Sequence, residues 1–200
     1  LALGVTIVHP VDLDGDDADD LVASAHLEGA VYALHGPLAP GVIDRTQAIS
    51  ELVPHGAFPA VDLAVGTAGF GRALVVGTPG EPEEACSAAG APVVLGLPLP
   101  ATGRLDEVAQ TRVVGLDPFS CPGAMVAFTD LTGDGVDDLV IVSTRAGAWL
   151  FFGPIGAGDL DAANADLMVP AASGTYGGYL GTQALVLDFD DDGDRDPDPG

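Results

Sequence analysis

One short pattern occurs three times in this chain, and it restricts the fold to short strands joined by tight turns. Asp20, Asp62 and Asp138 are each followed by Leu, an apolar stretch and a glycine nine residues on. Those glycines begin second apolar runs, which read GAVYALHGP from Gly29, GRALVVGTP from Gly71 and GAWLFFGP from Gly147. Apolar segments of about five to seven residues are typical of strands and too short for helices. The chain is therefore predicted to be all-β.

An incoming strand and an acidic loop precede this pattern. GAMVAFTD from Gly123 and GTQALVLD from Gly181 place an aspartate seven residues after a glycine, and GVTIVHPVD from Gly4 does so after eight. Each unit thus reads as a strand, a nine-residue acidic loop, a strand, a tight turn and another strand. The loops that start at Asp130 and Asp188 are 58 residues apart, which gives the expected length of one unit.

This spacing predicts four repeats, at about 1–45, 46–122, 123–180 and 181–200, the last of them only begun. The second repeat is altered, because the segment 54–62 keeps Asp62 but has lost the other carboxylates, so it is expected to bind no metal. It also has a long insertion that contains Cys86 and Cys121. The two cysteines permit one disulfide, and the alternative is two separate thiols.

Charge and hydropathy narrow the range of partners. The net charge is −24, with 30 acidic residues against six arginines and no lysine, which disfavours binding to nucleic acid or to an anionic membrane. No apolar run approaches the roughly 18 residues that a membrane helix needs, so no membrane insertion is expected. Hard cations are the natural partners of such a chain.

The aspartates are concentrated in three loops whose spacing suits calcium. Segments 12–20, 130–138 and 188–198 hold 17 of the 24 aspartates. Calcium takes six to eight oxygen ligands, and alternate residues of a curled loop point inward, so positions 1, 3, 5 and 9 with the carbonyl of position 7 form one candidate site per loop. These ligands are Asp12, Asp14, Asp16, Ala18 and Asp20 in the first loop, Asp130, Thr132, Asp134, Val136 and Asp138 in the second, and Asp188, Asp190, Asp192, Asp194 and Asp196 in the third.

The loops have two other interpretations. An EF-hand needs a glutamate at position 12, but Ala23, Ile141 and Pro199 stand there, so an EF-hand is excluded. The other alternative is that the loops are solvated acidic turns without an ion. Glycines at position 4 or 6, which are Gly15, Gly133, Gly135 and Gly193, supply the backbone freedom that a tight loop needs.

No catalytic signature accompanies the loops. His9, His26, His35 and His55 show no metal-ligand spacing, and no G-x-S-x-G sequence is present. Trp149, Phe151 and Phe152 lie along one expected strand, where core packing is favoured over stacking on a ligand. The chain is expected not to be an enzyme.

The segment DLTGDGVDDLVIVSTRAGAWLFFGP from Asp130 resembles the FG-GAP repeats of integrin α-chain β-propellers and the related bacterial VCBS repeats, and DLDGDDADDLVASAHLEGAVYALHGP from Asp12 is similar to them as well. The resemblance implies a β-propeller fragment built from four-stranded antiparallel blades, with calcium in the acidic loops and further blades outside this chain. The Phe-Gly pair of the family is not kept before the loop, since Phe70-Gly71 lies in the later glycine turn.

This resemblance implies a non-catalytic, calcium-binding module of a secreted or cell-surface bacterial protein, a scaffold for adhesion or for recognition of a protein or glycan. The alternative is an accessory region of a larger secreted enzyme, whose catalytic domain lies outside these residues.

Overall fold

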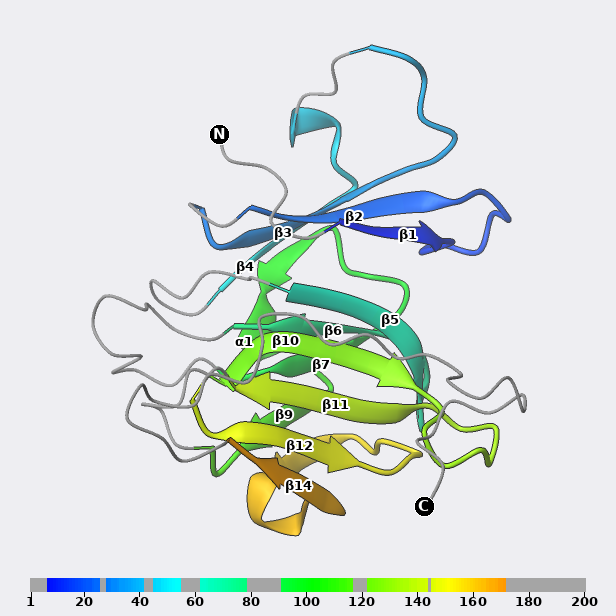
Figure 1. Ribbon diagram of the computed structural model, residues 1–200. Coiled ribbons are helices and arrows are strands. Elements are labelled where there is room, and N and C mark those ends of the chain that lie inside the picture. The colour runs from blue at the N-terminus through cyan, green and yellow to red at the C-terminus, as the bar shows by residue number, and fades with distance from the viewer. Residues whose placement is uncertain are drawn as a thin grey trace.

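The computed structural model describes residues 7–25, 28–41, 45–54, 62–78, 91–116, 122–143 and 145–171, with only the backbone for residues 7–11. This part of the chain is almost entirely β, in three sheets (Figure 1). Its helices are the four-residue α1, Leu105–Val108, and two 3₁₀ turns at Arg45–Gln47 and Ala162–Asn164. The all-β prediction is confirmed as far as a mostly-β structure with almost no helix in the described residues. Cys86, Cys121 and the third acidic loop lie outside the described residues.

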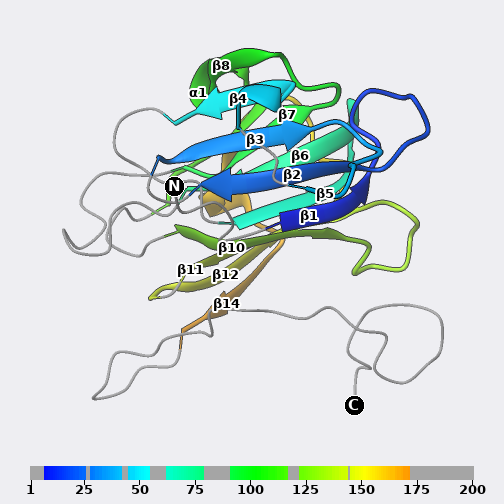
Figure 2. The same cartoon turned by 90° about the horizontal axis from the view of Figure 1, so that it is seen from above.

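Two of the sheets share one arrangement. The N-terminal sheet is built from β1 (Ile7–Val11), β2 (Asp20–Ala25), β3 (Ala30–Leu34) and β4 (Ser50–Val53). The C-terminal sheet is built from β10 (Pro122–Thr129), β11 (Asp138–Ser143), β12 (Gly147–Phe151) and β14 (Leu167–Pro170). In both, the four strands pair antiparallel in chain order (Figure 2), and an acidic loop joins the first strand to the second.

The middle sheet contains β5 (Asp62–Ala68), β6 (Gly71–Gly77), β7 (Val93–Gly96) and β9 (Thr111–Val114), again antiparallel in chain order. Two short strands extend the sheets by parallel pairing, which the sequence pattern did not predict. β8 (Thr102–Arg104) lies beside β4 in the N-terminal sheet, and β13 (Gly158–Asp161) lies beside β9 in the middle sheet.

The tight turns that follow the second strands depend on glycine. Gly147 has a φ of 131°, which L side chains rarely adopt, and a Cβ there would collide with the backbone carbonyl of Val169 on β14. The pattern of an aspartate followed nine residues later by glycine therefore marks where each hairpin starts and where it turns.

The middle sheet packs between the other two. Leu74 and Val76 of β6 belong to a buried apolar cluster with Val22, Val31 and Leu52 of the N-terminal sheet. Ala73 and Val75 belong to a second cluster with Val126, Leu139 and Ile141 of the C-terminal sheet. Because alternate residues of a strand point to opposite faces, β6 is buried on both sides.

The aromatic residues of β12 divide between core and surface. Trp149 and Phe151 are buried in the cluster between the middle and C-terminal sheets, which confirms core packing for both. Phe152, just beyond the strand, is 43% exposed.

Candidate metal-binding loops

The first loop (residues 12–20) and the second loop (residues 130–138) share most of their internal hydrogen bonds. In the first, the Asp12 carboxylate accepts N–H groups from Gly15 at 2.7 Å, Asp16 at 3.3 Å and Asp17 at 3.2 Å. In the second, Asp130 accepts from Asp134 at 3.2 Å and Gly135 at 2.7 Å. The aspartate at position 1 therefore closes each loop by binding the N–H groups of positions 5 and 6.

The aspartate at position 5 also accepts the same hydrogen bond in both loops. Oδ1 of Asp16 accepts the N–H of Ala18 at 2.8 Å, and Oδ1 of Asp134 accepts that of Val136 at 2.9 Å. The predicted glycines have left-handed backbone at Gly15, Gly133 and Gly135. Position 6 of the first loop holds Asp17 instead, with a φ of 65°, and aspartate is among the few other residues that adopt this conformation.

The aspartate at position 9 has a structural role that the sequence pattern did not predict. Asp20 and Asp138 are buried, at 2% and 0% exposure. Asp20 accepts the N–H of Leu13 at 2.7 Å and that of Gly36 at 2.8 Å. Asp138 accepts the N–H of Leu131 and that of Gly153, both at 2.8 Å. Each carboxylate thus ties position 2 of its loop to the Gly-Pro that follows the third strand.

Glycine is required at both positions because a backbone carbonyl of the loop lies too close for a side chain. A Cβ on Gly36 would collide with the backbone carbonyl of Asp19, and one on Gly153 would collide with that of Asp137. The carbonyl at position 8 of each loop therefore packs directly on the glycine whose N–H binds the position-9 carboxylate. The Gly-Pro sequences that end the repeated runs were the signal in the sequence for this contact.

The loop N–H groups also affect ionisation. The pKa of the Asp12 carboxyl lies below its ordinary value, chiefly because the N–H of Gly15 binds the charged form, with further help from other loop N–H groups. The Asp12 side chain consequently stays ionised to lower pH than a free aspartate.

The first loop brings its predicted ligands together. Asp12, Asp14 and Asp20 each offer a carboxylate oxygen within 4.8 Å of the others. Among the described residues, the second loop forms no such group of three acidic or histidine side chains, and Thr132 stands at its position 3. Oxygen ligands suit calcium, so the residues of the first loop fit a hard cation. The Ala18 and Val136 carbonyls remain predicted ligands.

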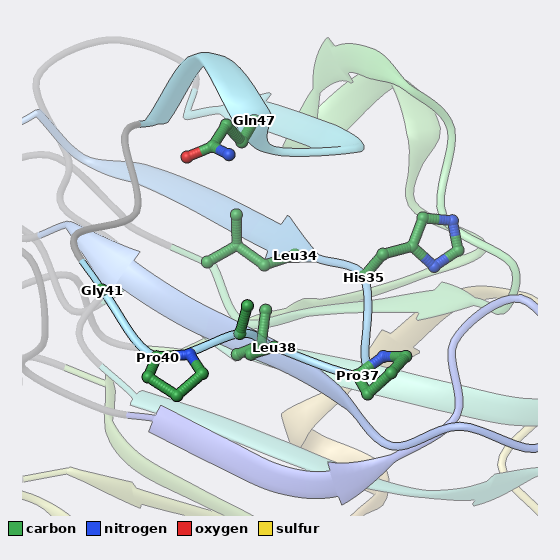
Figure 3. Close-up of a pocket in the computed structure, with 8 residues that line it drawn as sticks. Leu34, His35, Pro37, Leu38, Pro40, Gly41 and Gln47 are labelled. Atoms are coloured by element: carbon green, nitrogen blue, oxygen red, sulfur yellow. The ribbon is translucent and has the colours of Figure 1, made fainter.

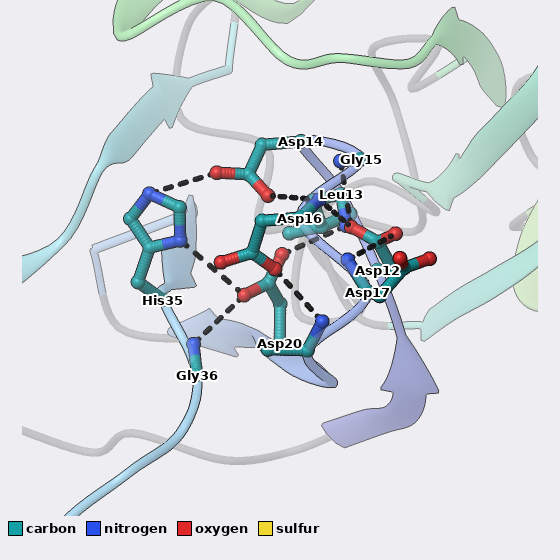
Figure 4. A network of polar contacts seen from close by, with 10 residues as sticks. Asp12, Leu13, Asp14, Gly15, Asp16, Asp17, Asp20, His35 and Gly36 are labelled. Atoms are coloured by element: carbon teal, nitrogen blue, oxygen red, sulfur yellow. Dashed lines mark hydrogen bonds and ion pairs between the residues drawn. The ribbon is translucent and has the colours of Figure 1, made fainter.

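A histidine from another strand joins the first loop (Figure 4). Nε2 of His35, just after β3, lies 3.0 Å from Oδ2 of Asp14, and its Nδ1 lies 3.5 Å from Oδ1 of Asp20. Asp14, Asp16 and His35 form a second group with ligand atoms within 4.8 Å of one another. Sequence spacing missed His35, because the fold brings it beside residues about 20 positions earlier.

The middle sheet uses its aspartate differently. Asp62 accepts the N–H of Val126 at 2.8 Å, so its carboxylate connects β5 to β10 of the C-terminal sheet. Asp137 of the second loop accepts the N–H of Thr67 on β5 at 2.7 Å. The second loop is therefore attached to the neighbouring sheet.

An open hollow of about 300 Å³ lies between the end of β3 and the 3₁₀ turn at Arg45–Gln47, and Figure 3 shows the residues that line it. Its lining combines the apolar residues Leu34, Pro37, Leu38 and Pro40 with the polar residues His35 and Gln47. His35 is the one titratable residue among the described residues that line the hollow.

In the described part of the chain, no helix is long and apolar enough to cross a membrane. Comparison with models of protein families finds no family that matches, and comparison with curated proteins finds no matching relative.

Proposed function

We propose that this chain is a non-catalytic, calcium-braced part of a β-propeller of the FG-GAP or VCBS kind, on a secreted or cell-surface bacterial protein. Its role is that of a scaffold that presents loops for adhesion or for recognition of a protein or glycan. The observation that carries the proposal is the shared framework of the two described loops, in which aspartates at positions 1 and 5 bind the same backbone N–H groups.

The packing of the sheets supports the propeller part of the proposal. Blades of a propeller are four-stranded antiparallel sheets that repeat around a centre. The N-terminal and C-terminal sheets have this strand order, and the middle sheet packs between them. The other face of the C-terminal sheet carries a second buried apolar cluster, with Met125, Val140 and Val142, so this sheet is apolar on both faces, as a blade with neighbours on both sides is.

The residues of the loops support calcium as the ion. Asp12, Asp14, Asp16 and Asp20 would hold it in the first loop, and Asp130, Thr132, Asp134 and Asp138 in the second. The position-9 carboxylate oxygens each accept one N–H, and a carboxylate oxygen has a second lone pair for a metal. A bound calcium ion would offset the repulsion among the loop carboxylates and hold the loop rigid.

Thermal unfolding of chelator-treated protein tests this function. For a dissociation constant of about 10⁻⁴ to 10⁻³ M, 10 mM calcium should stabilise each site by about 1.4 to 2.7 kcal/mol, while magnesium should have little effect. Asp134→Ala should reduce the calcium response. Asp62→Asn is the matched control, because it removes a charge outside the loops and keeps an oxygen acceptor for the Val126 N–H. No calcium-dependent rise in melting temperature would refute the proposal.

A further inference from the structure

We propose that the first loop and His35 together form a site for a divalent transition metal of the zinc type, with Asp14, Asp16 and one imidazole nitrogen as its protein ligands. The inference rests on the proposed function, since it takes the first loop to be a cation-binding loop. It adds that His35 changes which cation this loop prefers.

The ligand atoms converge from two separate segments. His35 follows β3, whereas Asp14 and Asp16 belong to the loop between β1 and β2. Nε2 of His35 is 3.0 Å from Oδ2 of Asp14, and the ligand atoms of all three residues lie within 4.8 Å of one another. Zinc bonds of about 2.1 Å place neighbouring ligand atoms about 3.0 to 3.4 Å apart, so only small side-chain movements are needed. All three residues are exposed, which leaves a path for the ion and room for water ligands.

A buried carboxylate lies beside the other ring nitrogen of His35. Asp20 has a side chain with 0% exposure, fixed by the N–H groups of Leu13 and Gly36, and its Oδ1 lies 3.5 Å from Nδ1 of His35. Histidines that bind metals usually direct their other ring nitrogen to a carboxylate, a backbone carbonyl or water. His35 has this arrangement, with Nδ1 toward Asp20 and Nε2 toward the exposed acids.

The imidazole decides the class of metal. Calcium and magnesium take oxygen ligands, whereas imidazole suits zinc, copper, nickel and iron. The second loop is an internal control, since Phe152 stands before its Gly-Pro in the place of His35 and Thr132 stands at its position 3. The two loops should therefore differ in their preference for zinc while both accept calcium.

Nitrogen NMR of the histidine rings, with zinc ion alone as the probe, tests the inference in the chelator-treated chain. The first equivalent of zinc should shift the Nε2 signal of His35. His35→Phe, which copies the second loop, and His35→Asn should each weaken zinc binding at least about tenfold. Asp134→Ala changes only the second loop and should leave zinc binding at His35 unchanged. The His35 side chain is 42% exposed, so both variants should fold, which circular dichroism verifies.

Zinc binding that leaves the His35 signal unmoved, or that is equally tight in His35→Phe, would overturn the inference. Failure of the proposed function can be distinguished from failure of the zinc site. If zinc binds at His35 but calcium does not raise the melting temperature, the calcium role is wrong and the zinc site stands. If calcium stabilises the protein but zinc does not engage His35, only the zinc site is wrong.

Discussion

The first and second loops have one backbone framework in two different surroundings. Both are closed by an aspartate at position 1 and tied by a buried aspartate at position 9 to a Gly-Pro. The first loop then meets His35, while the second binds the neighbouring sheet through Asp137 and Thr67. The framework thus depends on positions 1, 5 and 9, and the chemistry and attachment of each loop depend on the residues around it.

The largest effect is expected at position 9. Asp138→Ala leaves the N–H groups of Leu131 and Gly153 without their acceptor and should lower the free energy of unfolding by about 3 to 6 kcal/mol, since bonds to charged acceptors contribute about 1.5 to 3 kcal/mol each. Asp20→Ala should cost a similar amount, because it removes the same pair of bonds. Urea unfolding measures both. If either variant lowers the free energy of unfolding by less than about 1 kcal/mol, the position-9 aspartates do not have the same role in the two loops.

A second effect concerns the glycine before proline. Gly153→Ala and Gly36→Ala each force a Cβ into a position-8 carbonyl, and each should destabilise the protein by about 1 to 3 kcal/mol. Gly156→Ala is the control, since a Cβ there meets nothing within 4 Å. Urea unfolding should rank the first two variants well below the control, and equal stability of all three would contradict the close approach.

Substitutions at position 8 should change the free energy of unfolding by different amounts in the two loops. Asp137→Ala removes the acceptor of the Thr67 N–H and should cost about 1 kcal/mol. Asp19→Ala, at the same position of the exposed first loop, should change the free energy of unfolding by less than about 0.5 kcal/mol. Equal costs for the two variants would show that the contact with the middle sheet does not distinguish the loops.

The smallest effect is on pH dependence. Because the pKa of Asp12 is lowered in the folded protein, its ionised form adds stability that is present above about pH 4 and is lost as the pH falls through its folded pKa. Carboxyl NMR of metal-free protein should find the pKa of Asp12 below 3.8. Asp12→Asn should then lose less stability on acidification than the wild type, and an unshifted Asp12 would contradict the N–H contacts.

The strands and loops could be predicted because they depend on local pattern. The aspartates that begin β2, β5 and β11, and the glycines that turn the chain after them, lie at fixed spacing along the sequence. The parallel strands β8 and β13 could not, because TGR and GDLD are short and show no apolar alternation, so long-range pairing decides their conformation.

The acidic residues of the site could be predicted from the sequence, but the residues that they contact could not. The spacing predicted that Asp12, Asp14 and Asp20 would lie together, as they do, but the hydrogen bond that Gly36 donates to Asp20 joins residues 16 positions apart through the pairing of β2 with β3. His35 occupies a position that is phenylalanine in the other matching repeat, so the repeat itself gave no sign of an imidazole beside the loop.

The central claim is that each loop binds its own calcium ion, and equilibrium dialysis with radioactive calcium tests it most directly. The wild type is compared with Asp16→Ala, Asp134→Ala and the double variant, all checked for folding by circular dichroism. Each single variant should bind one calcium ion fewer than the wild type, and the double variant two fewer. A double variant that binds as much calcium as the wild type would contradict the account.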